Sequence, residues 1–156
     1  MKLQQDLREF VALLNSHIVE FLVVGGHAVA FHGHPRFTGD IDFLLRPSVP
    51  NASRALDALH AFGFGDLSLS IDDFVKLGNV IQLGRPPNRI DLLTSISGVE
   101  FEDAWASRVH AELDGLPVCF LGWQSLIENK EASGRPKDLA DVAKLKAVAA
   151  ARRPPG

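Results

Sequence analysis

The chain has 156 residues, of which 46% are hydrophobic and 22% are charged, and its formal net charge is -3. This composition excludes disordered, collagen-like and coiled-coil proteins, and the length favours one domain. A single cysteine excludes an internal disulfide and indicates a reducing cytoplasmic location, and no apolar run is long enough to span a membrane.

The first part of the chain predicts a helix, a strand and a second helix. Apolar residues at steps of three and four, from Leu3 to Ile18, are typical of a helix with one buried face. The apolar run over residues 20–24 predicts a buried strand that ends in a tight turn at Gly25-Gly26. A short helix over residues 27–32 follows this turn.

The middle of the chain predicts a strand, a helix and a hairpin. Residues 41–45 form the strand, and the helix after it has Asn51 as its predicted N-cap. Gly63 ends that helix. Residues 80–83 and 89–93 are two further strands, and the segment between them is rich in glycine and proline, which indicates a hairpin.

The last part of the chain predicts a second hairpin and two helices. Asp114-Gly115 is a strong hairpin signal, and it separates strands over residues 109–113 and 116–121. One helix covers residues 123–132, and Pro136 opens the next helix at a position where proline is favoured.

This order of elements is typical of an α/β or α+β protein. We expect a single domain over residues 1–150, in which a small mixed β-sheet is flanked by helices and the chain closes with a helix pair. Residues 151–156 are expected to form a flexible tail.

Three aspartates carry the candidate chemistry. Asp40 and Asp42 lie two residues apart at the start of a strand, so their carboxylates project from the same face. Asp91 lies within another apolar strand. If the two strands are neighbours, the three carboxylates can hold two Mg²⁺ or Mn²⁺ ions for phosphoryl or nucleotidyl displacement. The alternative is that Asp40 caps a turn while Asp42 and Asp91 face solvent.

Several other residues suggest phosphate binding. Gly25 and Gly26 follow a strand and open a helix, and glycine lets a phosphate approach the backbone closely. His27 follows this turn and could donate to a phosphate there, and Arg36 could clamp a triphosphate through its planar fork. Thr38 could orient the carboxylates or cap the turn, and the sequence does not separate these roles.

Taken in order, these motifs resemble the DNA polymerase β-like nucleotidyltransferase superfamily. The resemblance rests on Val23 to Ala30, with its Gly-Gly turn, on the Asp-x-Asp motif of Asp40 and Asp42, and on Asp91 as a third carboxylate on a later strand. The stretches His32–Thr38 and Asn129–Asp141 are most similar to the bacterial subgroup related to AbiEii-type abortive-infection toxins.

The resemblance implies a nucleotidyltransferase fold and a cytoplasmic enzyme. With Mg²⁺ or Mn²⁺, such an enzyme transfers NMP from an NTP such as ATP to a hydroxyl of RNA, tRNA included, or of a protein. Asp40 and Asp42 would ligate the metals, and Asp91 would ligate the catalytic metal and help to deprotonate the acceptor. Gly25 and Gly26 would face the phosphates. Lys130, Lys137 and Asp138 would lie near the nucleotide or brace the core.

Two departures from the family pattern support an alternative function. Gly26 stands where many active members carry serine, so one hydroxyl contact to phosphate is missing. No extra helical domain for a defined acceptor is expected after Ala150. The alternative is a catalytically weak nucleotide-binding or interaction module that acts with a partner protein, such as the cognate antitoxin or toxin of a toxin–antitoxin or phage-defence system. The base, the acceptor and the oligomeric state are not specified by the sequence.

Overall fold

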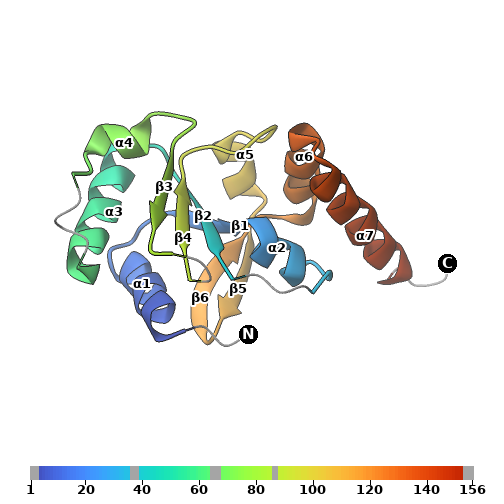
Figure 1. Ribbon diagram of the computed structural model, residues 1–156, viewed down its shortest axis with the longest axis horizontal. Coiled ribbons are helices and arrows are strands. Elements are labelled where there is room, and N and C mark those ends of the chain that lie inside the picture. The colour runs from blue at the N-terminus through green and yellow to red at the C-terminus, as the bar shows by residue number, and fades with distance from the viewer. Residues whose placement is uncertain (1–3, 36–38, 64–67, 86–87, 153–156) are drawn as a thin grey trace.

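The computed structural model describes residues 4–35, 39–63, 68–85 and 88–152, and these build a six-stranded mixed sheet flanked by helices (Figure 1). The strands are β1 (Phe21–Val24), β2 (Ile41–Leu45), β3 (Val80–Leu83), β4 (Ile90–Leu93), β5 (Val109–Leu113) and β6 (Leu116–Phe120). The helices are α1 (Gln5–Ser16), α2 (Gly25–Phe31), α3 (Val49–Phe62), α4 (Ile71–Val75), α5 (Phe101–Ala106), α6 (Trp123–Ser133) and α7 (Pro136–Arg152). The expected fold class is confirmed.

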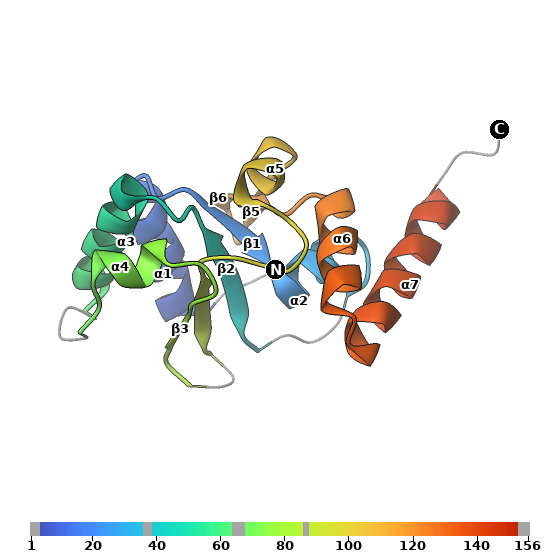
Figure 2. The same cartoon turned by 90° about the horizontal axis from the view of Figure 1, so that it is seen from above.

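The sheet has the strand order β3-β4-β2-β1-β6-β5. β2 runs antiparallel to β1 and parallel to β4, and β1 runs parallel to β6. The β3–β4 and β5–β6 pairs are antiparallel, as the two predicted hairpins require. Helices α1, α3 and α4 gather on one side of the sheet, and α2, α6 and α7 gather on the other (Figure 2).

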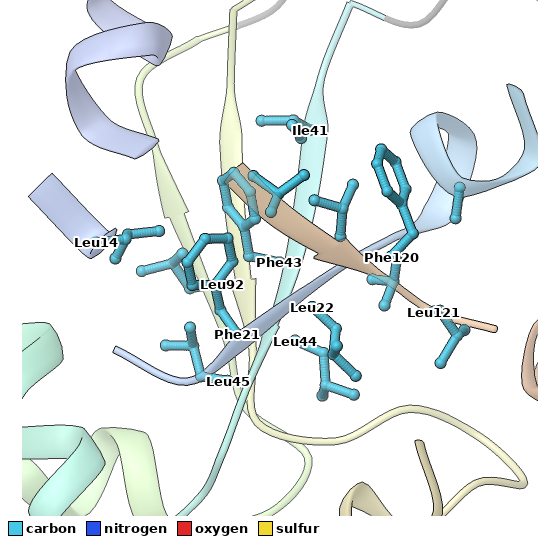
Figure 3. Packing of buried hydrophobic residues seen from close by; sticks show 14 of the residues in the cluster. Leu14, Phe21, Leu22, Ile41, Phe43, Leu44, Leu45, Leu92, Phe120 and Leu121 are labelled. Carbon is cyan, nitrogen blue, oxygen red and sulfur yellow. The ribbon is translucent and has the colours of Figure 1, made fainter. Parts of the chain in front are cut away.

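The core lies against the central strands (Figure 3). Phe43 of β2 is fully buried, and its ring centroid lies 5.5 Å from that of Phe21 and 6.1 Å from that of Phe10 on α1. Because side chains alternate along a strand, Phe43 and its neighbour Asp42 point to opposite faces of the sheet. One face of β2 therefore packs on α1, and Asp42 lies on the other face together with the buried Leu44.

Four sequence predictions are corrected by the structure. The N-cap of α3 is Ser48, whose side chain accepts a hydrogen bond from the Asn51 backbone N–H at 3.3 Å, and Asn51 lies inside the helix. Ile18 lies beyond the end of α1, where its side chain is 74% exposed. Sequence periodicity missed α4 because a helix of five residues is too short to repeat an apolar face. α7 continues to Arg152, two residues into the expected tail.

Asn51 has a different role from the predicted cap, because its buried side chain ties the start of α3 to the loops that flank β1 and β2. The amide oxygen accepts from the Glu20 backbone N–H at 2.7 Å. The amide nitrogen donates to the backbone oxygens of Glu20 at 3.0 Å and Arg46 at 3.1 Å. A buried amide with three backbone partners specifies the local geometry, because any partner left without it would be buried unpaired.

The described helices include none that is both long and apolar enough to cross a membrane.

Replacement of Asn51 by alanine is expected to lower the free energy of unfolding by about 2–3 kcal/mol, since it leaves buried backbone groups without partners. Chemical denaturation followed by circular dichroism measures this loss. Ser53→Ala, at an exposed position of the same helix, is the control and should change stability by less than about 0.5 kcal/mol. Equal stabilities of the two variants would contradict the role given to Asn51.

Candidate functional site

Two parallel strands bring the aspartates together. β2 pairs with β4 so that Asp42 lies directly opposite Asp91. β1 runs antiparallel to β2 and places Val24 opposite Asp42. Gly25, the next residue, therefore lies close to Asp42. The strands are therefore neighbours, which is the condition that the sequence argument required for a shared carboxylate site.

Asp42 and Asp91 form a carboxyl pair on the same face of the sheet. Asp91 is buried, Asp42 is half-buried, and a hydrogen bond joins the two side chains. Burial first, and then the hydrogen bond and negative charge of Asp91, raise the pKa of Asp42 to about 6. Below about pH 6 the Asp42 carboxyl is therefore mainly protonated and can donate to Asp91.

Arg89 supplies a cation to this cluster, and the sequence analysis did not identify it. Its Nε donates to Asp91 Oδ1 at 2.9 Å, and its Nη2 donates to Asp91 Oδ2 at 3.1 Å. Nη2 also lies 3.4 Å from Asp40 Oδ2, and the Arg89 backbone N–H donates to Asp40 Oδ1 at 3.2 Å. The available signal was spacing: Arg89 precedes Asp91 by two residues, so both project from the same face of an extended chain.

The described residues contain no group of three or more His, Cys, Asp or Glu side chains that already surrounds a position for a metal ion. The reason lies in the contacts above, since Asp42 bonds to Asp91 while Asp40 and Asp91 bond to Arg89. All three side chains are nevertheless carboxylates, the oxygen donors that suit a hard divalent cation. The raised pKa of Asp42 comes first from burial and then from its contact with Asp91.

Gly25 is required at its position by two separate constraints. Its φ is +65°, which is the left-handed region that favours glycine. A Cβ atom placed there would lie 2.2 Å from Asp42 Oδ2, which is far inside van der Waals contact. The glycine that ends β1 therefore makes room for the catalytic candidate on β2.

A cavity of about 510 Å³ opens beside these residues. Its lining comes from three parts of the chain: Gly25, Gly26 and Asp42, residues of the loops before β3 and after β4, and residues of α6, α7 and the turn between them. Of the C-terminal residues predicted to lie near a nucleotide, all three line it, namely Lys130, Lys137 and Asp138. Cavities of several hundred Å³ are the size that small-molecule ligands occupy.

Lys130 and Asp138 also brace α6 against α7. The buried Lys130 Nζ lies 3.2 Å from Asp138 Oδ1 and 3.1 Å from Asp141 Oδ2. Arg135 Nε lies 2.8 Å from Asp138 Oδ2. Burial by itself raises the pKa of Asp138, but the hydrogen bonds from Arg135 and Lys130 outweigh it and hold the pKa below its usual value. Lys130 and Asp138 therefore have both of the expected roles: they line the cavity and they brace the helix pair.

The remaining predicted residues fall elsewhere. His27 is buried and is not among the cavity-lining residues; its ring bonds to the backbone of Asp40. Burial lowers the pKa of the imidazole despite that hydrogen bond, so His27 is neutral and holds the Asp40 backbone in place. Arg36 and Thr38 lie outside the described residues.

Gly25→Ala is expected to destabilise the protein by about 1–3 kcal/mol more than Gly115→Ala, measured by chemical denaturation. Gly115 is a matched control because it also has a positive φ, +78°, but no atom lies within 4 Å of an added Cβ. Adding Asp42→Ala to Gly25→Ala should recover the excess loss, since it removes the clashing carboxylate. Equal losses for the two glycines would show that Asp42 does not require Gly25.

The carboxyl pair also predicts a pH dependence of stability. The pKa of Asp42 in the folded protein is about 6, above the ordinary value of 3.8. Its contribution to stability is therefore fully present below pH 4 and is lost as the pH rises through 6. In metal-free buffer, the wild type should lose about 1–3 kcal/mol relative to Asp42→Asn over this interval. Parallel stability curves for the two proteins would contradict the raised pKa of Asp42.

Comparisons with known proteins find a similar structure but no similar sequence. No family model matches the chain, and no curated protein matches it. Among solved structures, the chain is similar to the crystal structure of a protein from Thermotoga maritima described as a "putative nucleotidyltransferase", with a TM-score of 0.56 and 16% sequence identity. The match covers 94% of this chain and 91% of that chain.

The similarity extends over nearly the whole length of both chains, so the sheet and the C-terminal helix pair belong to one shared architecture. An identity of 16% supports the fold and not the activity. It also does not separate the AbiEii-type subgroup from other branches. The chain has a nucleotidyltransferase fold.

Proposed function

We propose that this protein is a divalent-metal-dependent nucleotidyltransferase, which transfers NMP from an NTP to a hydroxyl group. One observation carries the proposal: the β2–β4 pairing sets Asp42 opposite Asp91, and Asp42 lines the same cavity as Gly25 and Lys137. Asp42 is the member of the triad that lines this cavity, and a carboxylate, a glycine backbone and basic side chains are groups that suit a metal–triphosphate. The nucleotidyltransferase fold supports the same class of reaction.

Asp40, Asp42 and Asp91 would hold Mg²⁺ or Mn²⁺, which supplies Lewis-acid stabilisation of the negative charge on the transferred group. The backbone of Gly25 and Gly26 would face the phosphates, where the absence of side chains permits close approach. Lys137, which is exposed at the cavity, would offset phosphate charge.

The bond changes assign a role to Asp91. The acceptor oxygen forms a bond to the α-phosphorus, the bond from that phosphorus to the bridging oxygen breaks, and pyrophosphate leaves. The acceptor's proton passes to the Asp91 carboxylate, which lies buried on β4 opposite Asp42.

The finer assignment follows the family resemblance. We propose ATP or another NTP as donor, a hydroxyl of RNA (tRNA included) or of a protein as acceptor, and a bacterial toxin–antitoxin or phage-defence setting with a cognate partner protein. A net charge of -3 does not favour polyanions. An RNA acceptor would therefore need a local basic surface, such as Lys144, Lys146 and Arg152 on α7, or a basic partner. The single cysteine supports a cytoplasmic location.

One observation favours the alternative, a nucleotide-binding or interaction module with weak turnover. Arg89 already compensates part of the carboxylate charge that a metal would compensate. Gly26 also lacks the hydroxyl found at this position in many active members of the family that the chain resembles.

A label-transfer assay tests the enzyme function. The protein is incubated with each of the four α-³²P NTPs, Mg²⁺ or Mn²⁺, total bacterial RNA and lysate. Label should appear on RNA or protein with the wild type, and Asp42→Asn and Asp91→Asn should each reduce it at least ~100-fold, since each removes a metal ligand. Asp57→Asn, at an exposed position on α3, is the control and should transfer normally.

Undiminished transfer by Asp42→Asn would contradict the mechanism. Absence of label, together with NTP binding that does not require a divalent metal in calorimetry, would support the interaction module instead.

A further inference from the structure

Arg89 stands out because it is the cation of the carboxylate cluster, and the proposed function assigns it no contact with substrate. Its guanidinium donates to both oxygens of Asp91, at 2.9 and 3.1 Å, and reaches Asp40 Oδ2 at 3.4 Å. A fork with two parallel N–H···O bonds is the strongest geometry in which arginine binds a carboxylate. The guanidinium thus engages two of the three carboxylates that a divalent cation would use.

The charge balance explains why an arginine belongs here in the metal-free protein. Asp91 is buried, with a side chain only 10% exposed, and it faces another carboxyl group. A buried carboxylate without a compensating cation is costly. Arg89 places one positive charge against both oxygens of Asp91 and beside Asp40. A divalent cation would bring twice that charge to the same oxygens, so the two occupants compete.

The local structure allows the guanidinium to leave without dismantling the site. The Arg89 side chain is 29% exposed, so solvent is adjacent to it. Asp40 has a second anchor that is independent of that side chain, since its Oδ1 accepts from the Arg89 backbone N–H at 3.2 Å. Asp42 and Asp91 remain fixed by the β2–β4 register. Release of Arg89 would therefore free carboxylate oxygens while the strands that carry them stay in place.

We propose that Arg89 is a resident counter-cation of the triad: it holds Asp91 and Asp40 in the metal-free protein, and a divalent cation binds only by displacing it. The inference rests on the proposed metal-dependent function and adds a regulatory property to the same site. The free protein binds its metal weakly, because each binding event must break the bonds between Arg89 and Asp91. Arg89 is a positioning residue in this scheme, since it acts through the carboxylates.

The test is a calorimetric titration with Mn²⁺ alone, in the absence of nucleotide. Arg89→Gln keeps a hydrogen-bonding side chain but loses the charge, and it should bind Mn²⁺ at least tenfold more tightly than the wild type. Arg89→Lys keeps the charge without the fork and should fall between them. Arg85→Gln, at an exposed position in the same β3–β4 connection, should match the wild type.

Thermal melting gives a readout that a purely structural role would not produce. In EDTA, Arg89→Gln should melt below the wild type because Asp91 loses its cation. Saturating Mn²⁺ should close that gap, since the metal then compensates the carboxylates in both proteins. A gap that persists in saturating Mn²⁺ would overturn the inference, because Arg89 would then be needed beside the metal.

The outcomes separate this inference from the proposed function. Equal or weaker Mn²⁺ binding by Arg89→Gln, with binding by the wild type, would overturn the displacement of Arg89 and leave the metal-dependent function standing. No Mn²⁺ binding by any of the proteins would overturn both. If Arg89→Gln does not fold, NMR of the wild type tests the inference instead. The Arg89 Nε–H resonance should shift on saturation with Mg²⁺. An unchanged resonance would overturn the inference.

Discussion

The structure depends on one pairing, the parallel contact between β2 and β4 that sets Asp42 opposite Asp91. Two acidic side chains at one register position of an apolar sheet are unfavourable for folding, because each raises the cost of ionising the other. The neighbouring groups reduce that cost: Asp42 and Asp91 share a hydrogen bond, and Arg89 binds Asp91. The carboxyl pair costs stability, and yet it lies at the centre of the sheet. This is the strongest physical argument that the pair belongs to a functional site.

The residues around the β2–β4 pairing make room for its aspartates or hold them in place. Gly25 leaves the space that the Asp42 carboxylate occupies, and His27 bonds to the backbone that presents Asp40. On the opposite face of β2, Phe43 packs against Phe10 and Phe21 and fixes the strand from behind. Since a packed core tolerates little displacement, the carboxylates are held by the apolar face as much as by their polar neighbours.

The C-terminal helix pair completes the site from the other end of the chain. Lys130 lies between Asp138 and Asp141, so the angle between α6 and α7 is held by buried charges as well as by apolar contacts. Removal of one partner from such a group would leave an uncompensated buried charge. α7 and the turn before it carry Lys137 and Arg135 to the cavity that Gly25 and Gly26 line. The cavity therefore forms only when the C-terminal helix pair is assembled beside α2 and β2.

The sequence by itself determined the local parts of this protein. Alternation and turn chemistry predicted the strands, the hairpin at Asp114-Gly115 and the helix pair, because these are properties of neighbouring residues. Only the tertiary structure decided that β2 lies beside β4, that Arg89 binds Asp91 and that Asn51 is a buried anchor and not a cap. Those facts depend on segments that meet across the fold, and no periodicity within a segment encodes which other segment it will meet.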